Sequence, residues 1–177
     1  MATLDILQVG HPTLREQAQS LDTDALASEH WQGFIDDLIE TMRAANGAGL
    51  AANQVGQLVR ICAVEVQANN PRYPEKEPIP LTILVNPVLT ALDESTLTSY
   101  EGCLSVPNLR GQVTRNAHIR VDYLDRDGQP QSRIAQGIQA VTYQHECDHL
   151  DGKLFLDNVG DPTTLTTWEN FERHHRR

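Results

Sequence analysis

Two histidines and a glutamate near the end of the chain have the types and spacing of half a catalytic metal site. In the segment QHECDHLDGKLF, His145 and His149 are four residues apart, and Glu146 follows the first histidine. Residues four apart share one face of an α-helix, so both imidazoles can bind a single metal ion. Glu146 is rotated about 100° from His145, so its carboxylate can reach a water on that ion without binding the ion itself. The alternative is a helix whose histidines only pair with nearby acidic side chains.

A catalytic site of this kind needs a third protein ligand, and the segment itself does not supply one. In one metalloprotease class the run continues to a third histidine, as H-E-x-x-H-x-x-G-x-x-H. Here Gly152 matches the glycine, but Phe155 occupies the histidine position. The residues leave two sources open. One is a glutamate farther along the chain, Glu169 or Glu172; the other is Cys103, whose thiolate would be a strong, soft ligand.

Three separated segments resemble the three motifs of the peptide deformylase family. They are GAGLAANQ (Gly47 to Gln54), EGCLS (Glu101 to Ser105) and QHECDHL (Gln144 to Leu150), in the family's order and spacing. Weaker similarity runs from GHPTLREQA near the start to DGKLF, so the resemblance covers most of the chain. It implies that Cys103 is the third metal ligand, beside His145 and His149.

The resemblance implies a metal-dependent hydrolase that removes the formyl group from the N-terminal formyl-methionine of nascent polypeptides and releases formate. In this chemistry a divalent metal lowers the pKa of its bound water, and the resulting hydroxide attacks the formyl carbon. Glu146 is expected to act as the general acid/base. The resemblance also assigns two catalytic donors to the oxyanion, the Gln54 side-chain amide and the Leu104 backbone N–H. Without it, Gln54 would be taken for a loop cap and Leu104 for a packing residue.

Four further residues are expected at the substrate site. Gly47 and Gly49 would let the backbone pass close to the substrate, although glycines in a loop usually mark only a turn. Ala48 departs from the larger aliphatic residue that the family often has there, which implies a roomier methionine pocket. Arg110 matches a family position near the substrate side-chain pocket, and a solvated surface arginine is the alternative.

Two acidic residues are candidates for orienting the metal ligands. Glu101 could accept a hydrogen bond from a ligand histidine, which would fix the tautomer and basicity of that ring. Asp148 is expected to do the same or to pair with an arginine such as Arg115. Cys147 lies roughly opposite His145 on the helix, so we predict a small buried core residue rather than a ligand.

One divalent metal ion per chain is the predicted cofactor. A Cys-His-His set with one open position is ordinary for zinc. The resemblance instead implies Fe(II) in the cell, with Zn(II) or Ni(II) able to occupy the same site. Two other function classes stay open, namely a metallopeptidase and a non-catalytic protein with a structural metal. A structural site is closed by four ligands, whereas the sequence offers three good candidates and an intact glutamate.

Composition and charge exclude several classes of protein. The 177-residue chain has 40% hydrophobic and 21% charged residues, a formal net charge of −10 and a pI near 5.0. This charge argues against broad nucleic-acid binding, which depends on lysine and arginine, and we expect no sequence-specific nucleic-acid partner. No apolar run approaches a membrane span, and the N-terminus lacks a secretory signal pattern. Three scattered cysteines fit reduced thiols in the cytoplasm.

The expected partners are N-formyl-Met nascent peptides and, transiently, the ribosome near its exit tunnel. The basic end of the chain, Arg173 to Arg177, is the candidate for contact with ribosomal RNA. A solvated, frayed tail is the alternative. No membrane partner is expected.

A single α+β domain, residues 1–177, would position these side chains. We expect mixed or antiparallel β-sheets packed around a central metal-binding helix, with N-terminal and C-terminal helices. Periodicity and turn residues predict a helix from Asp24 to Ala45 capped by Asp24 or Ser28, strands at Val59 to Val66 and Leu81 to Leu89, a hairpin with an Asp-Gly turn from His118 to Gly137, the histidine-bearing helix from Gly137 to Leu150 and a last helix near Asp161-Pro162. The segment GAGLAANQVGQ is too rich in glycine and alanine for a strand core, and Gln67 to Pro80 is predicted to be a solvated loop.

Overall fold

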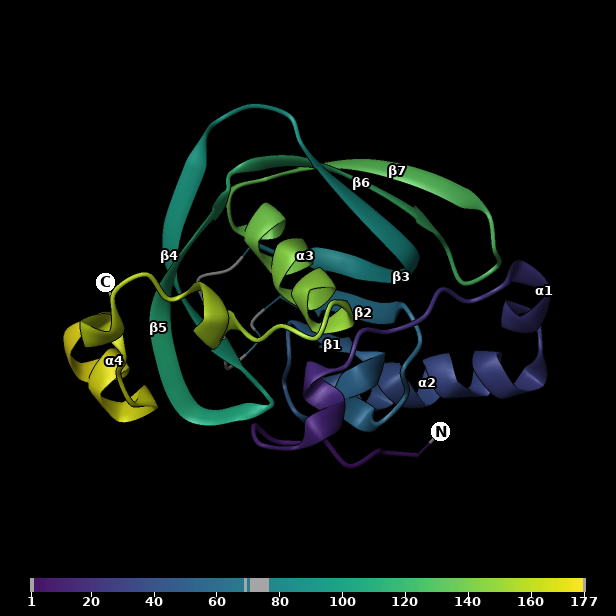
Figure 1. Ribbon diagram of the computed structural model, residues 1–177, viewed down its shortest axis with the longest axis horizontal. Helices are drawn as coiled ribbons and strands as arrows, with labels where there is room; N and C mark the ends of the chain where they lie inside the picture. Colours follow the sequence, from purple (N-terminus) through teal and green to yellow (C-terminus); the bar gives the residue numbers. More distant parts are fainter. Residues whose placement is uncertain (1, 69, 71–76, 177) are drawn as a thin grey trace.

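A five-stranded antiparallel sheet forms the larger layer of the fold. The computed structural model describes residues 2–68, 70 and 77–176 and places the strands in the order β1-β2-β3-β6-β7 (Figure 1). The strands are β1 (Gly49–Ala51), β2 (Ile61–Val66), β3 (Ile79–Ala91), β6 (His118–Leu124) and β7 (Pro130–Gln136). Side chains alternate between the two faces of a strand, so β2 contributes to two separate cores. Ile61 and Ala63 join one core, and Cys62 and Val64 join the other.

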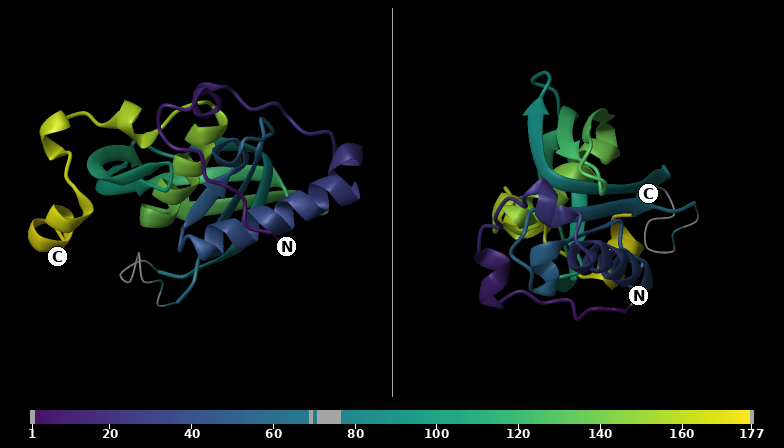
Figure 2. Two further views of the ribbon diagram at one scale, coloured as in Figure 1. Left: turned by 90° about the horizontal axis from the view of Figure 1, so that it is seen from below. Right: turned by 90° about the vertical axis from the view of Figure 1, so that its right-hand side faces the viewer.

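Helices cover both faces of this sheet. They are α2 (Glu29–Ala44) and α3 (Gly137–Leu150). The apolar stripe of α2 buries Ile35 and Leu38 in the core that contains Ile61, as its periodicity predicts. On the opposite face, Tyr143 of α3 packs in the core that contains Val64. Figure 2 shows α2 running along the side of the sheet, toward α1.

A second sheet encloses α3 and explains why that helix is buried almost all round. It consists of β4 (Thr96–Cys103) and β5 (Val106–Asn116), which pair antiparallel. The helix contacts both β1 of the large sheet and β5 of the small one, so it lies at the centre of the molecule (Figure 1). The predicted α+β architecture around a central metal-binding helix is therefore confirmed. Every pair of named strands is antiparallel.

The first predicted helix is divided in two. The structure has α1 (Thr23–Leu26) and then α2, with a break at Ala27 and Ser28. The Asp22 side chain accepts a hydrogen bond from Asp24 N and caps α1, while Ser28 Oγ accepts one from Trp31 N and caps α2. Ser28 is thus the cap of the long helix, and the alternative cap Asp24 is wrong because it lies inside α1.

The other predicted elements are mostly confirmed. The helix Gly137–Leu150 has its predicted bounds, and β6–β7 is the predicted hairpin. Asp161-Pro162 begins only a short 3₁₀ turn, and the last helix starts later, after the Thr167 cap. The remaining short elements are η1 (Pro12–Arg15), η2 (Ala52–Val55), η3 (Phe155–Asn158), η4 (Pro162–Thr164) and α4 (Trp168–His174). Much of the predicted Gln67 to Pro80 loop lies outside the described residues, and β3 already begins at Ile79.

The segment after α2 differs from its prediction, since Gly49–Ala51 forms a strand despite its small residues. It pairs with β2, where Gly49 lies opposite Val64. Small side chains are needed here because β1 passes directly beside α3. No helix in the described part of the chain is long and apolar enough to cross a membrane.

Candidate metal centre

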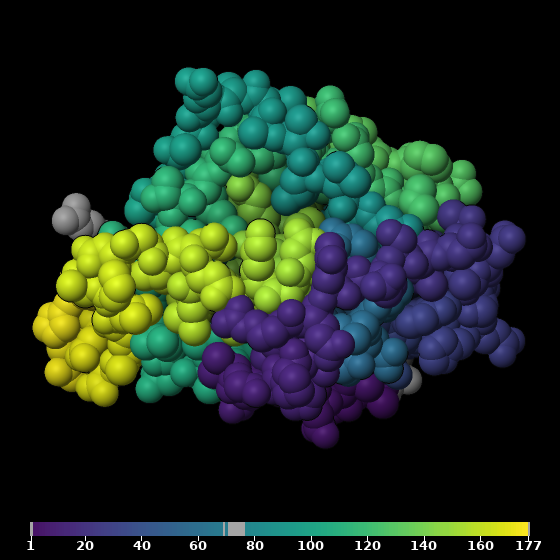
Figure 3. Space-filling model, viewed as in Figure 1, coloured from purple at the N-terminus to yellow at the C-terminus, as the bar shows by residue number. Residues whose placement is uncertain are grey.

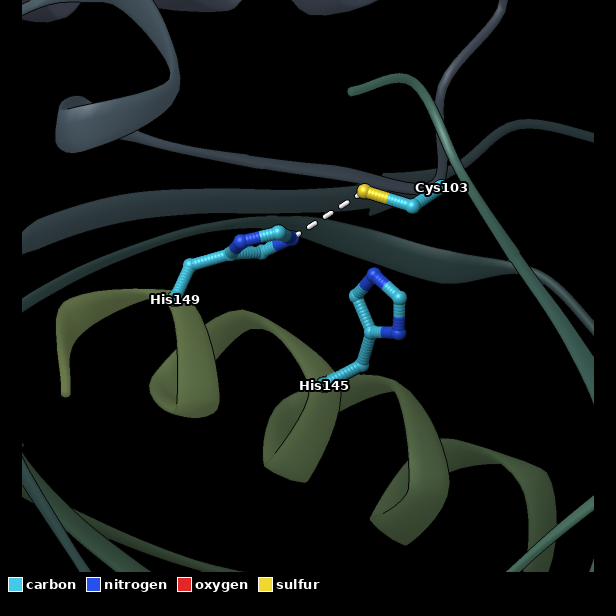
Figure 4. A group of neighbouring side chains, drawn as sticks. All are labelled: Cys103, His145 and His149. Atoms are coloured by element: carbon cyan, nitrogen blue, oxygen red, sulfur yellow. Dashed lines mark hydrogen bonds between the residues drawn. The ribbon is translucent and has the colours of Figure 1, made fainter. Parts of the chain in front are cut away.

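The three predicted ligands meet at the middle of the molecule. His145 and His149 project from one face of α3, and Cys103 is the last residue of β4 (Figure 4). One donor atom from each residue lies within 4.8 Å of the other two. Cys103 Sγ and His149 Nε2 are 3.3 Å apart. Within the described residues this is the one such group of histidine, cysteine and acidic side chains.

A change of register at the end of β4 directs Cys103 toward the helix. Gly102 pairs with Arg110, but the next residue, Cys103, pairs with Val106, so the ladder is irregular at this point. Such irregularities re-aim a side chain without breaking the sheet. The Ser105 N–H donates to Cys103 Sγ at 3.4 Å, across the turn that joins β4 to β5.

The surroundings of Cys103 favour a thiolate. Burial by itself would raise the pKa of this thiol, but the charge of His149 and hydrogen bonds from both histidines hold its pKa well below the usual range. A thiolate with two imidazoles is the donor set of zinc and of other borderline or soft transition metals. The residues present therefore fit a divalent ion with three protein ligands.

Glu101 and Arg115 fix the orientation of His145. Glu101 Oε2 lies 2.8 Å from His145 Nδ1, which leaves Nε2 of the same ring for a metal. Arg115 holds Glu101 through two hydrogen bonds of 2.7 and 2.9 Å and also contacts Asp148 at 2.5 Å. Burial alone would raise the pKa of Glu101, but hydrogen bonds from Arg115 and His145 lower it to about 2. The carboxylate therefore stays ionised beside the ligand ring.

A cavity opens beside the ligands and brings all three motifs together. Its lining includes Gln54 from the first motif, Leu104 from the second and Glu146 from the third. Ala48 lies in the same wall, where its small side chain leaves room in the cavity. Tyr100 and Val141 add aromatic and aliphatic surface. A hydrophobic cavity with a few convergent polar groups is the usual form of a ligand site.

Gly47 and Gly49 are glycines for a reason that their sequence pattern does not reveal. A Cβ added at Gly49 would overlap the carboxyl group of Glu146. A Cβ added at Gly47 would lie 2.9 Å from Leu104 Cδ1. Both glycines thus leave space for side chains of the site, in addition to any approach of a substrate.

Arg110 is buried, which makes the solvated alternative wrong. Its side chain is covered by α4, with the guanidinium carbon 3.8 Å from the ring centroid of Trp168 and 4.6 Å from that of Phe171. Arg110 does not line the cavity itself. Its aliphatic part lies behind Gly102, where an added Cβ would be 3.3 Å from Arg110 Cγ.

The alternative ligands lie elsewhere. Glu169 and Glu172 are on α4 and pair with Arg173 and Arg176 one turn later. Cys147 is buried in the core, as predicted. The alternative in which Glu169 or Glu172 is the third metal ligand is therefore wrong. The metallopeptidase interpretation depended on such a glutamate and is wrong with it.

Two residues at the site were not singled out from the sequence. Ser105 Oγ accepts a hydrogen bond of 3.0 Å from Gln54 Nε2, and Asn53 Nδ2 donates to the backbone oxygen of His149. Both residues are completely buried. The sequence signal that could have identified them is their position in two motifs, since Asn53 belongs to GAGLAANQ and Ser105 to EGCLS.

Comparisons with known proteins agree with this geometry. The family model described as polypeptide deformylase matches residues 3–164. A peptide deformylase 1 from Prochlorococcus marinus (strain MIT 9313) is 45% identical over 165 residues, covering 93% of this chain and 85% of the relative. A peptide deformylase from Azotobacter vinelandii is 39% identical and covers 100% of this chain and 99% of the relative.

The fold is also that of solved deformylases. The Met-ala-ser bound crystal structure of class I type b peptide deformylase from Acinetobacter baumannii superposes with a TM-score of 0.85 at 34% identity, covering 89% of this chain and 99% of that one. A peptide deformylase from Synechococcus elongatus in complex with actinonin gives a TM-score of 0.79 at 31% identity, covering 93% and 82%. Family model, relatives and fold agree over nearly the whole length. The chain therefore belongs to the peptide deformylase family and is a metal-dependent hydrolase, with Cys103, His145 and His149 as its metal-binding group.

Proposed function

We propose that the substrate is the N-terminal formyl-methionine of nascent polypeptides, and that Glu146 is the general acid/base of its hydrolysis. The observation that carries this proposal is the placement of the Glu146 carboxyl group. It lies in the cavity wall one residue after the ligand His145, in space that Gly49 leaves for it. A carboxylate so placed can act on a water in the cavity without taking a ligand position.

The metal-binding group would hold one divalent ion, which we propose is Fe(II) in the cell, with Zn(II) or Ni(II) able to replace it. When bound, such an ion polarises the substrate oxygen and lowers the pKa of a water molecule. The low pKa of the Cys103 thiol and the Glu101–His145 hydrogen bond support a divalent cation at this site, because both prepare donor atoms for it. The choice of Fe(II) rests on the family resemblance.

Glu146 would move one proton in two steps. It takes the proton from the water that attacks the formyl carbon, and it delivers that proton to the methionine nitrogen as the C–N bond breaks. The water oxygen ends in formate and the peptide leaves with a free amine. Burial of Glu146, at 4% exposure, keeps bulk water from competing for that proton.

Gln54 and Leu104 would stabilise the negative oxygen that develops during the attack. The Gln54 side chain and Leu104 both line the cavity next to Cys103. A side-chain amide and a backbone N–H donate hydrogen bonds without adding a charge, which suits an oxyanion site. Each such donor typically contributes about 10²-fold or more to kcat.

The residues around Ala48 would set the preference for the methionine side chain. Ala48 and Gly49 line the cavity, whereas Gly47 lies behind Leu104, and we propose that Ala48 widens the pocket relative to a larger aliphatic residue. Arg110 would act indirectly, by supporting Gly102 from behind.

The cellular setting follows from the proposed substrate. Residues 1–177 would form one catalytic domain that works in the cytoplasm and meets the ribosome transiently near its exit tunnel. Arg173 and Arg176 already pair with glutamates of α4, which lowers the net positive charge available for RNA. Deleting residues 173–177 and measuring co-sedimentation with ribosomes tests this contact, since unchanged binding would exclude it.

Formate release tests the proposed reaction directly. Anaerobically purified protein should release formate from a formyl-Met-Ala-Ser peptide and leave the acetyl-Met analogue intact. Glu146→Ala should retain the metal and lose about 10²-fold or more in kcat, as expected for removal of an acid/base. A Glu146→Ala variant with full turnover would refute the role of Glu146.

A further inference from the structure

The N-terminal segment, residues 2–21, is hydrogen-bonded to each of the three segments that build the site. Leu7 N donates to Gln54 O at 2.8 Å, Val9 N to Ser105 O at 2.7 Å, and Ala18 N to Leu150 O at 2.9 Å. Figure 3 shows this segment in purple on the surface, beside the yellow-green residues that follow α3.

The far end of this segment is fixed to the long helix. Ala2 N donates to Asp37 Oδ1 at 2.6 Å, and Leu4 N donates to Thr41 Oγ1 at 2.9 Å. Residues 2–9 therefore run from α2 across the 3₁₀ turn that carries Gln54 to the β4–β5 turn that carries Leu104 and Ser105. These two turns belong to different parts of the fold, because β1 lies in the large sheet and β4–β5 form the small one.

Ser105 is the point where the segment meets the site. It is fully buried, and each of its three polar groups has a separate partner. Its carbonyl accepts from Val9 N, its hydroxyl accepts from Gln54 Nε2, and its N–H donates to Cys103 Sγ. One residue thus joins the N-terminal segment, a proposed oxyanion donor and a metal ligand.

These contacts fix the orientation of the Gln54 amide. Gln54 Oε1 accepts a hydrogen bond of 2.8 Å from Ala51 N, which prevents the amide from turning over. On the other side, Ser105 Oγ takes one hydrogen of the NH₂ group at 3.0 Å. The same nitrogen is 3.6 Å from Cys103 Sγ, so its second hydrogen is directed toward the metal-binding group.

We propose that Ser105 and the backbone N–H groups of Leu7 and Val9 are positioning groups for the oxyanion donors Gln54 and Leu104. They hold two turns from different sheets in register, so that both donors face the same point of the cavity. This inference rests on the donor roles proposed above for Gln54 and Leu104. Positioning matters because a misplacement of about 1 Å can cost about 10²-fold in rate.

Two variants test the positioning groups separately. Val9→Pro removes the N–H that bonds Ser105 O, and Ser105→Ala removes the hydroxyl but keeps the N–H that reaches Cys103. Each should lower kcat for a formyl-Met-Ala-Ser peptide about 10-fold, with KM changed less than about 2-fold and one metal per chain retained. Gln8→Pro is the matched control, because Gln8 is exposed and its N–H donates no hydrogen bond within the described chain; it should keep full kcat.

Combination with Gln54→Ala separates positioning from a general loss of stability. The Ser105 hydroxyl contacts Gln54, so Ser105→Ala should not lower kcat appreciably further once the Gln54 amide is gone, whereas Val9→Pro should still lower it through Leu104. A fully additive loss on combining Ser105→Ala with Gln54→Ala, or full kcat in both single variants, would overturn the inference. Should Val9→Pro fail to fold, Ser105→Ala alone still decides.

Gln54→Ala by itself distinguishes the donor role of Gln54 from the positioning role of Ser105. A large loss of kcat in Gln54→Ala together with unchanged Ser105→Ala would leave the donor role intact and refute the positioning role. Unchanged kcat in Gln54→Ala would refute the donor role, and the positioning role with it.

Discussion

Gly49→Ala is the smallest change that should disable the site without touching a ligand. The added Cβ would overlap the carboxyl group of Glu146 and would lie 2.6 Å from Glu146 Cγ. The backbone of Gly49 cannot retreat easily, because β1 pairs with β2 and Gly49 lies opposite Val64. Glu146 must therefore move.

The size of the effect follows from this overlap. Carbon atoms in contact prefer a separation of about 3.5–4.0 Å, so the Glu146 side chain would be displaced by about 1 Å. A misplacement of about 1 Å costs about 10²-fold in rate, and complete loss of an acid/base costs about 10²–10⁴-fold. We expect kcat for a formyl-Met-Ala-Ser peptide to fall about 10²-fold, with metal content unchanged.

The assay compares formate release, metal content and thermal unfolding with a matched control. Gly33→Ala adds the same methyl group to an exposed position of α2, with nothing within 4 Å of the new atom. It should keep full kcat and stabilise the protein by about 1 kcal/mol through helix propensity. A Gly49→Ala variant with the kcat of the parent would refute the argument that Glu146 needs this space.

Two further predictions concern the ligand surroundings. Arg115→Met should destabilise the fold by about 3–5 kcal/mol in urea unfolding, because it leaves the Glu101 carboxylate buried without its cation. It should also weaken metal affinity about 10–100-fold, because Glu101 orients the ligand His145. Unchanged metal affinity would contradict the role of the Arg115–Glu101 contact. Burial alone lowers the pKa of His145, but hydrogen bonds that its ring donates to Cys103 and Glu101 raise the pKa well above its usual range in the metal-free protein, so a binding cation must displace a proton. Metal affinity should therefore fall as pH is lowered, and calorimetry in two buffers of different ionisation enthalpy should detect proton release, whereas equal heats in both would contradict it.

Local pattern was sufficient for the elements that depend on their own residues. The helix that carries His145 and His149 was predicted with its bounds, and alternating residues with an Asp-Gly turn predicted the β6–β7 hairpin. Elements determined by packing were missed. β1 forms because its small residues fit beside α3, and the last helix begins at Trp168, after a 3₁₀ turn whose Asp-Pro start resembles a helix cap.

The site shows the same division. The spacing of His145, Glu146 and His149 already described one helical face, which needs no knowledge of the rest of the fold. Cys103 came from a family resemblance, because no local pattern shows that the end of β4 meets α3. The burial of Arg110 under Trp168 was likewise not predictable from the sequence, because it depends on how α4 docks on the small sheet.

X-ray absorption spectroscopy of the zinc-loaded protein tests the metal centre most directly. One sulfur at about 2.3 Å and two imidazole nitrogens at about 2.0–2.1 Å are expected around the metal. The sulfur signal should vanish in Cys103→Ala and persist in Cys147→Ala. A metal that keeps its sulfur ligand in Cys103→Ala, or that shows none in the parent protein, would contradict the assignment of Cys103, His145 and His149 as the metal-binding group.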